Sequence, residues 1–322
     1  MLNIGIDFKV LGDRLSGTIE YYQKHASDLL ATVPIDYTAG LGPTTLIKNV
    51  GSMKGNGLDL TLNSLNLNGP VKWTTSLNLN TNSDKIEDYY FTSNAANVVA
   101  SSGIAGLKGK PVVGVYSYPW AGLDPATGDP QGYINGHTSK DYATLAGPSL
   151  SLDDIQYNGP ANPKIFGSLG NTLSWKGFTI SAWITYKFGY YFKRRSINYS
   201  SLIRSGDGHL DFVKRWQKPG DEKITNVPSF VYPAMSGRDE FYSNSAILVD
   251  KGDHVRLQYI NISYDFGKSQ FRKLPIDHLQ LYANINNIGI LWRSNKDDID
   301  PEIAGDAVPA PKSTAIGLRL TF

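Results

Sequence analysis

In the segment 312–322 at the end of the chain, large apolar residues alternate with small or polar ones from Ala315 onward. In an extended chain, successive side chains point to opposite faces, so one face carries Ile316, Leu318, Leu320 and Phe322. The opposite face carries small and polar residues, including a charge. This pattern predicts a strand between an apolar and a polar medium, as in the closing strand of a transmembrane β-barrel.

Earlier segments repeat the pattern, and the sequence predicts nine strands in all. The other predicted strands are 2–10, 15–22, 58–63, 71–80, 164–174, 178–188, 255–266 and 279–286. Within 255–266 the alternation changes phase between Tyr259 and Ile260, which predicts a β-bulge. Most of these segments approach the roughly 9–11 residues that a barrel strand needs to cross a bilayer.

The connections between the predicted strands are alternately short and long. The short ones are 11–13, 66–70, 175–177 and 267–277, and the long ones are 26–55, 81–163, 190–253 and 291–311. Outer-membrane barrels have short periplasmic turns and longer extracellular loops, so this asymmetry indicates that topology. Aromatic residues at segment ends predict two interfacial girdles: Tyr21, Tyr22, Tyr89, Tyr90, Phe91, Trp175, Tyr190, Tyr191, Phe192, Phe266 and Trp292.

Composition narrows the class of protein further. The chain has no cysteine and a formal net charge of +2 without a basic stripe, so disulfides are excluded and a nucleic-acid partner is disfavoured. No apolar run reaches the about 20 residues of a membrane-spanning helix. An odd number of strands cannot close a bacterial barrel, and the first residues lack a secretory signal. We therefore expect residues 1–322 to be one partial barrel domain, without plug or N-terminal strands.

Several motifs together resemble the C-terminal barrel portion of a SusC/RagA-like TonB-dependent outer-membrane transporter. They are Asn-Ile-Gly-Ile-Asp-Phe at 3–8, Asn-Val-Gly-Ser-Met-Lys-Gly-Asn-Gly-Leu-Asp at 49–59, the stretch 109–130 with Gly-Leu-Asp-Pro-Ala-Thr-Gly-Asp-Pro at its end, Trp-Lys-Gly-Phe at 175–178, and Asp-Pro-Glu at 300–302. After Pro130, an aspartate-rich loop typical of the family is absent, since 131–142 offers only Asp141.

The resemblance implies an all-β, antiparallel barrel of about 22 strands, of which this chain would supply nine. It implies import of oligosaccharides or peptides across the outer membrane of a Gram-negative bacterium. The implied partners are a SusD-like surface lipoprotein, TonB acting through the plug region, the remaining strands and plug, and outer-membrane lipid.

Loop residues offer two candidate substrate contacts. Aromatic residues Tyr116, Tyr118 and Trp120 lie near Asp124 and Asp129, and flat apolar rings beside polar acceptors are typical of sugar recognition. The alternative, which we favour, is that these rings pack the loop against itself or against a lipoprotein lid.

Arg194 and Arg195, which follow Lys193, are candidates for an anionic ligand or a lipopolysaccharide phosphate. As an alternative, they are simply a solvated basic cluster at the outer rim.

No catalytic constellation is present, and we expect neither an enzyme nor a cofactor. The five histidines lack metal-ligand spacing, so no metal site is predicted. A carboxylate cluster near the end (Asp297, Asp298, Asp300, Glu302 and Asp306) is more typical of a solvated loop than of a Ca²⁺ site. Two other classes stay open: a secreted β-sandwich or solenoid that binds glycan, and a small outer-membrane hydrolase.

Overall fold

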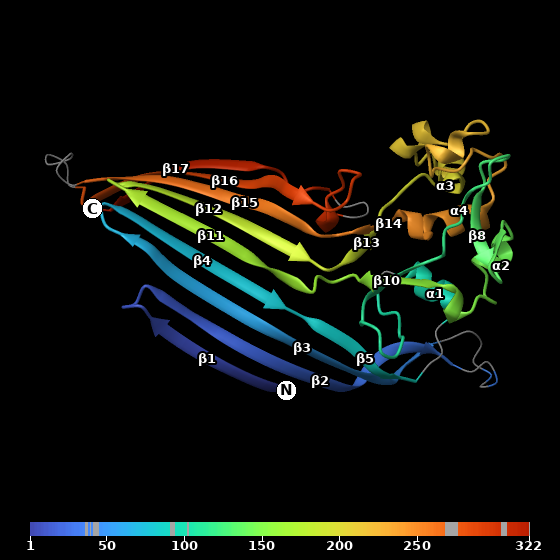
Figure 1. Cartoon of the computed structure of the whole chain (residues 1–322), viewed down its shortest axis with the longest axis horizontal. Helices are drawn as coiled ribbons and strands as arrows, with labels where there is room; N and C mark the ends of the chain where they lie inside the picture. Colours follow the sequence, from blue (N-terminus) through green and yellow to red (C-terminus); the bar gives the residue numbers. More distant parts are fainter. Residues whose placement is uncertain are drawn as a thin grey trace.

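One antiparallel sheet of ten strands carries the rest of the molecule (Figure 1). The computed structural model describes residues 1–322 except 36–37, 39, 41–44, 91–93, 102, 268–275, 304–307 and 322. Nine strands follow one another in the order β1-β2-β3-β4-β11-β12-β15-β16-β17, and β5 pairs with β3 outside this path. Their bounds are β1 Leu2–Val10, β2 Leu15–Pro34, β3 Thr45–Asn68, β4 Val71–Thr81, β5 Ser83–Tyr89, β11 Ile165–Trp175, β12 Phe178–Phe188, β15 His254–Phe266, β16 His278–Arg293 and β17 Ser313–Thr321.

The short helices and small strands gather at one end of this sheet, called here the long-loop end (Figure 1). The first long connection there contains α1 Ala95–Ala100, β6 Gly114–Ser117, β7 Gly122–Leu123, β8 Pro130–Ile134, β9 His137–Ser139, α2 Tyr142–Leu145, η2 Leu152–Asp154 and β10 Gln156–Pro160. The second contains β13 Tyr191–Lys193, α3 Tyr199–Ser205, η3 Leu210–Lys214, η4 Asp221–Lys223, α4 Ser236–Ser243, η5 Ala246–Leu248 and β14 Val249–Lys251, and the last contains η7 Pro301–Ile303. Among the described residues, none of the helices combines the length and the apolar character that crossing a membrane requires.

The nine predicted strands are the nine strands of the sheet path, in sequence order. Short turns join them at the opposite end, called the turn end. In the turn after β11, both Lys176 and Gly177 have positive φ (45° and 86°), which is the type I′ geometry that matches strand twist. Part of the predicted turn 267–277 and the terminal Phe322 lie outside the described residues.

The prediction of a long loop over 26–55 was wrong. β2 continues to Pro34 and β3 begins at Thr45, and these extended parts pair with each other. Register shifts between Ala26 and Leu30 interrupt the alternation there, so the period-two pattern was hidden. β5 pairs with β3 on its other side, over Gly51–Asn56. The three strands form an extension that projects past β4 at the long-loop end (Figure 1).

Other predicted details need smaller changes. The bulge in β15 is confirmed, and the register places the extra residue, Gln258, between Leu257 and Tyr259. The stretch 81–163 is not irregular throughout, because it holds β5 and the elements α1 to β10. The strand predicted over 279–286 continues to Arg293.

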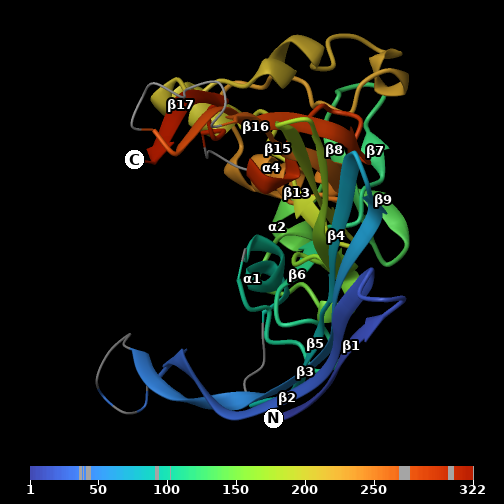
Figure 2. The ribbon, with the colours of Figure 1, turned by 90° about the vertical axis from the view of Figure 1, so that its left-hand side faces the viewer.

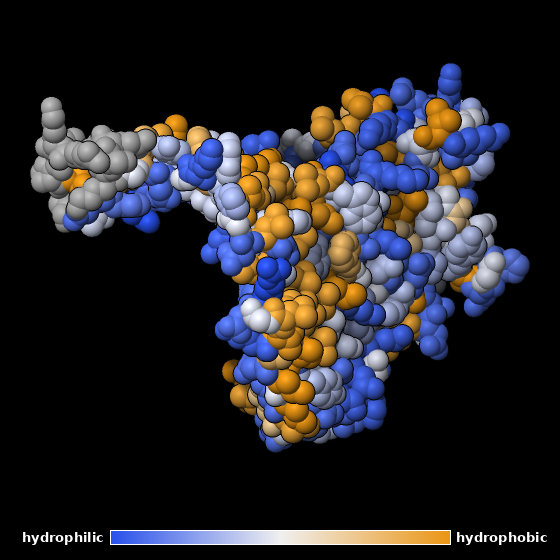
Figure 3. All heavy atoms as spheres, turned by 60° about the vertical axis from the view of Figure 1, so that its left-hand side comes forward, coloured by the Kyte–Doolittle hydropathy of each residue, from blue (hydrophilic) through white to orange (hydrophobic). Residues whose placement is uncertain are grey.

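The cross-strand register gives the sheet one apolar and one polar face, since residues directly opposite in an antiparallel pair share a face. Leu62, Leu77 and Leu169 are successive partners across β3, β4 and β11, and Ile184 and Leu257 continue the row across β12 and β15. The strands follow an arc (Figure 2), and apolar side chains gather along them (Figure 3).

Many side chains of the apolar face lack any cover. Ile6 is 66% exposed and Ile316 is 75% exposed, at opposite edges of the sheet. The described residues supply no second layer against this face, although a soluble β-sandwich would need one. The buried residues instead form clusters within the long-loop end. The observation argues against the sandwich alternative.

Aromatic rings cover glycines at cross-strand positions of the sheet. Trp183 lies opposite Gly170, Tyr22 opposite Gly57, and Tyr282 opposite Gly317. A Cβ added at Gly170 would lie 2.5 Å from Trp183 Cε2, and one at Gly317 would lie 2.5 Å from Tyr282 Cζ. Glycine is therefore required because the ring occupies the space of its missing side chain.

Replacing Gly170 by valine should destabilise the sheet by about 1–3 kcal/mol, because the Trp183 ring must leave its position. Tryptophan emission and the denaturant midpoint of the refolded barrel measure the effect. Combining Gly170→Val with Trp183→Val should recover most of the lost stability. Equal loss in the single and double variants would show that ring displacement is not the cause.

The girdle prediction fits some of the aromatic residues and not others. Trp175 and Trp292 are 51% and 50% exposed, at opposite ends of the sheet. Tyr190 and Phe192 are buried within the long-loop end, so for them the prediction was wrong. Burial against the other loops, which the sequence does not reveal, determines their position. Phe91 lies outside the described residues.

Candidate functional site

The long-loop end is a folded assembly with its own hydrophobic core. Pairing of β10 with β6, and of β13 with β14, joins segments that leave from different strands. A parallel bridge between Tyr118 and Ser245 connects the first long connection to the second. Surfaces that could meet a substrate are therefore positioned by packing between loops.

Two of the three aromatic candidates lie inside this core. Tyr116 is 2% exposed and Tyr118 is 1% exposed, and the Tyr118 ring stacks on Phe241 with centroids 5.6 Å apart. Burial raises the pKa of the Tyr118 hydroxyl to about 12. Neither hydroxyl has a hydrogen-bond partner among the described residues. Trp120 is half-buried, with its ring 6.0 Å from that of Tyr242. The arrangement is the loop packing that we favoured for these rings.

Asp124 and Asp129 are brought together by the tight turn between them. The Asp124 carboxylate accepts hydrogen bonds from the backbone N–H groups of Ala126 and Thr127. Lys140 Nζ lies 2.6 Å from Asp124 Oδ2 and 3.5 Å from Asp129 Oδ2. The hydrogen bond from Lys140 is the main reason that the pKa of Asp124 is lowered. The turn can therefore present fixed carboxylate oxygens at neutral pH.

Arg238 on α4 holds the turn between Asp124 and Asp129 in place. Its guanidinium is 2% exposed, and Nε donates to Asp129 Oδ1 at 2.8 Å. Nη2 donates to the backbone oxygen and the hydroxyl of Ser229. This role could not be predicted, because Arg238 lies in a polar stretch of the sequence without recognisable periodicity.

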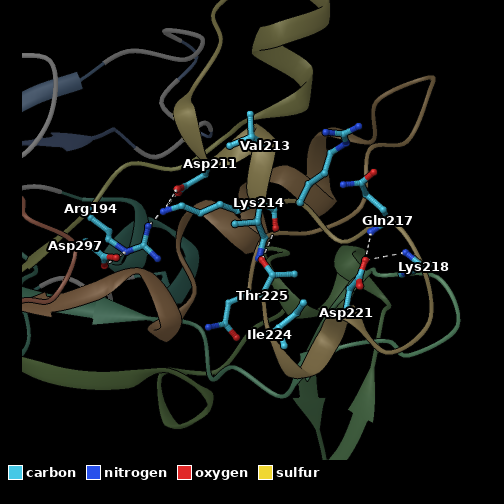
Figure 4. A pocket seen from close by; sticks show the side chains of 13 residues that line it. Arg194, Asp211, Val213, Lys214, Gln217, Lys218, Asp221, Ile224, Thr225 and Asp297 are labelled. Carbon is cyan, nitrogen blue, oxygen red and sulfur yellow. Dashed lines mark hydrogen bonds and ion pairs between the residues drawn. The ribbon is translucent and has the colours of Figure 1, made fainter.

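Arg194 is enclosed by carboxylates that come from three other segments, and Figure 4 shows two of them, Asp211 and Asp297. Its Nη1 lies 3.2 Å from Asp211 Oδ2, and its Nε lies 3.2 Å from Asp297 Oδ2 and 3.6 Å from Asp250 Oδ2. Burial raises the pKa of Asp250, although Arg194 opposes the shift. For Asp211 burial acts in the same sense, but a hydrogen bond from Ser196 and the charge of Arg194 outweigh it and lower the pKa. Arg194 thus holds the outer loops together.

Arg195, the other basic candidate, points elsewhere. Its side chain is 47% exposed and pairs with Asp207 at 3.3 Å. The structure therefore does not place the two arginines in one cluster, which was the premise of the anion-binding prediction.

A recess of about 720 Å³ opens beside Arg194 (Figure 4). Both charge signs line it, together with exposed apolar groups such as Ile224. Its lining residues are Arg194, Asp211, Val213, Lys214, Arg215, Gln217, Lys218, Asp221, Ile224, Thr225, Asn226, Val227 and Asp297. This recess suits a polar ligand with some apolar surface.

The acidic segment near the end of the chain forms ion pairs with arginines. Arg256 pairs with Asp300 at 2.5 Å and with Glu302 at 3.0 Å. Arg293 pairs with Asp298 at 2.6 Å. Asp306 lies outside the described residues, and across the residues that are described no group of three or more potential metal ligands occurs.

Lys193, the third member of the predicted basic cluster, is half-buried and makes contacts that the sequence did not predict. Its Nζ donates to the backbone oxygen of Val99 and, at 2.9 Å, to Asn244 Oδ1. It thereby joins α1 to the end of α4. Burial lowers the pKa of its ammonium group to about 8.

The Lys193 contact should become more stable as the pH rises from about 8 to about 10.4, the ordinary lysine pKa. The folded pKa lies below the unfolded one, so in this window the unfolded state binds more protons and stability increases with pH. Below pH 8 both states are protonated and the dependence disappears. Hydrogen exchange of the α1 amides, corrected for the intrinsic rate, measures this effect. Lys193→Met should abolish it, and an unchanged pH profile in that variant would contradict the assignment.

An antiparallel sheet with an uncovered apolar face and an opposite polar face has the architecture of an outer-membrane β-barrel wall. No protein-family model matches the chain. TonB-dependent receptor P39 of Formosa agariphila is 24% identical over 375 residues, covering 99% of this chain and 35% of the relative. TonB-dependent receptor P3 of the same organism is 24% identical over 318 residues, covering 94% and 30%. The chain spans about a third of the length of these curated relatives.

Solved structures agree in fold. The RagAB peptide transporter matches with a TM-score of 0.75 at 23% identity, covering 99% of this chain and 34% of that chain. The RagAB peptide importer in its closed-closed state matches with a TM-score of 0.73, also at 23% identity, covering 99% and 35%. The chain is a partial barrel related to the TonB-dependent receptors. The predicted resemblance is thereby confirmed.

Proposed function

We propose that the chain forms part of the wall and the extracellular loops of an outer-membrane transporter that imports nutrients. The observation that carries this proposal is the continuous apolar face, which the described residues leave uncovered, opposite a polar face. Exposure of such a surface to water would be unfavourable by about 25 cal/mol per Å². Hydrocarbon is the medium that removes this cost.

The turn end lies in the periplasm in this proposal, and the long-loop end lies outside the cell. Residues 1–322 act as one partial barrel domain, closed by further strands and filled by a plug. The cargo is an oligosaccharide or a peptide. RagAB is described as a peptide transporter, which supports the second choice without deciding between them. The relatives are receptors and transporters, so we assign no catalytic step.

The likeness to the RagAB structures supports the partners that we propose. A SusD-like lipoprotein covers the long-loop end, TonB acts through the plug, and outer-membrane lipid surrounds the apolar face. Of the predicted substrate contacts, Trp120, Asp124, Asp129 and Arg195 lie closer to the surface than Tyr116 and Tyr118. We propose that the two buried tyrosines support the contact surface and that the other residues, with Arg194 beside its recess, are the first to meet cargo.

Single cysteines test the membrane topology, because the chain has none of its own. Ile224→Cys at the long-loop end should react with a membrane-impermeant maleimide in intact cells, whereas Lys176→Cys at the turn end should react only after the outer membrane is opened. Labelling of both positions in intact cells would refute the proposed orientation.

Cargo is tested by deleting the gene and comparing growth on oligosaccharides and on peptides as sole nutrient. Unchanged growth on both nutrients would refute import of these two classes.

A further inference from the structure

A second recess, of about 580 Å³, lies on the extension formed by β2, β3 and β5. Its lining includes the basic side chains His25, Lys54, Lys85 and Lys108, and the exposed ring of Tyr90. Apart from Tyr90, which was predicted as a girdle residue, none of these residues was predicted to have a role. The recess is far from the Arg194 recess in sequence and shares no lining residue with it.

The register places this recess on the apolar side of the sheet. Tyr21 is paired with Leu58, and both belong to the exposed apolar face. Along the same face of the same two strands, the next pairs are Gln23 with Asn56 and His25 with Lys54. The face thus changes from apolar to polar to basic within a few residues. Such a change marks the boundary between hydrocarbon and headgroups.

The depth of the basic residues fits the headgroup layer. His25 is four residues beyond Tyr21, a distance of about 13 Å along a strand at about 3.3 Å per residue. A barrel strand is tilted by about 40°, so the rise above the apolar band is about 10 Å. Headgroup layers extend roughly 5–8 Å beyond the hydrocarbon on each side, and a lysine side chain reaches back into that layer.

The charges of the recess leave a net positive site. Glu87 is held by His25 at 2.8 Å and by Lys54, and Asp88 is held by Lys108 at 2.7 Å. Three lysines and two carboxylates give a charge of +1 with neutral histidine, and the described residues provide Lys85 with no carboxylate partner. Lysine ammonium groups that can rotate toward an incoming oxygen are common phosphate binders.

We propose that this recess binds a phosphate group on the headgroup of an outer-leaflet lipid. Lys54, Lys85 and Lys108 would contact the phosphate oxygens, Tyr90 would lie beside the sugar or glycerol moiety, and the acyl chains would cover the apolar face below. The proposal rests on the proposed membrane placement and not on the identity of the cargo. It assigns lipid binding to the outside of the wall, away from the transport path.

The test uses the whole natural protein that carries this sequence, purified in detergent, with diphosphoryl lipid A as the probe and native mass spectrometry as the readout. Lys54→Gln/Lys85→Gln/Lys108→Gln should reduce the bound lipid at least about tenfold, since each cation near a lipid phosphate contributes on the order of a fivefold factor. The matched control, Lys223→Gln/Lys251→Gln/Lys296→Gln, removes the same charge from exposed lysines of the outer loops and should bind normally.

Two further arms identify the source of the effect. Glu87→Gln keeps every lysine and removes one negative charge, so it should bind lipid A more tightly, even if the triple variant folds poorly. Enzymatically dephosphorylated lipid A should bind the unchanged protein weakly, and inorganic phosphate should not displace the intact lipid. Equal binding by the triple variant and its control, binding independent of lipid phosphate, or displacement by inorganic phosphate would each overturn the proposal. Maleimide labelling of Ile224→Cys reports membrane insertion separately, so loss of lipid binding with normal labelling refutes this inference alone.

Discussion

Arg194→Ala should weaken the long-loop end by about 3–5 kcal/mol, because removing one member of a buried ion pair leaves its partners charged and unpaired. Asp211 and Asp250 are the partners that matter most, since their side chains are only 10% and 22% exposed. Asp297 is 42% exposed, and water screens much of its charge. Faster hydrogen exchange of the η3 amides and faster proteolysis between 207 and 227 measure the loss.

A second substitution separates charge from packing in the Arg194 network. Adding Asp211→Asn to Arg194→Ala removes one of the carboxylates left without a cationic partner, and should recover part of the stability. Arg195→Ala is the control and should change the stability little, because Arg195 is exposed. Unchanged exchange rates in Arg194→Ala would show that the loops are held by their hydrophobic cores alone.

Leu77→Arg should destabilise the membrane-inserted barrel by about 2–4 kcal/mol, the cost of a cation on a lipid-facing strand near mid-bilayer. Leu77 lies near the middle of β4, between Leu62 and Leu169 on the apolar face. The denaturant midpoint of the barrel in lipid vesicles and its heat-modifiable gel mobility measure the effect.

Ser76→Arg is the matched control for Leu77→Arg. Ser76 precedes Leu77 and lies on the polar face between Asn63 and Gly170, so an arginine there meets water and polar side chains. This variant should assemble with less than about 1 kcal/mol of loss, as for an ordinary surface substitution. If both arginines are tolerated equally, the apolar face does not contact lipid.

The sheet was predictable because the alternation of apolar and polar residues within each strand reflects the environments of its two faces. Leu58, Leu60 and Leu62 alternate with polar residues whatever the rest of the chain does, and the register confirms that they share a face. The prediction failed over 26–55, where β2 and β3 extend past the apolar band. Register shifts between Ala26 and Leu30 interrupt the alternation there, so a period of two residues does not identify the strand.

The loop site was much less predictable. Tyr116 and Tyr118 alternate with Val115 and Ser117, yet all four are buried because the strand β6 is enclosed on both faces by other loops. Arg194 and Arg195 are neighbours in the chain, but only Arg194 is surrounded by carboxylates. In the first case the fold buries residues that the alternation distinguishes, and in the second it separates two residues that the local sequence does not distinguish.

The sequence by itself determined the nine strands of the sheet path, the alternation of faces within their predicted parts and the end from which the long loops leave, but it missed β5 and the extended parts of β2 and β3. A bilayer imposes these properties on every strand separately, so a period of two residues is enough to encode them. The tertiary structure alone decided which carboxylates meet Arg194, Arg238 and Arg256, and where basic residues meet at the rim of the apolar face. Such contacts join distant segments, and no local period specifies which distant side chains will come together.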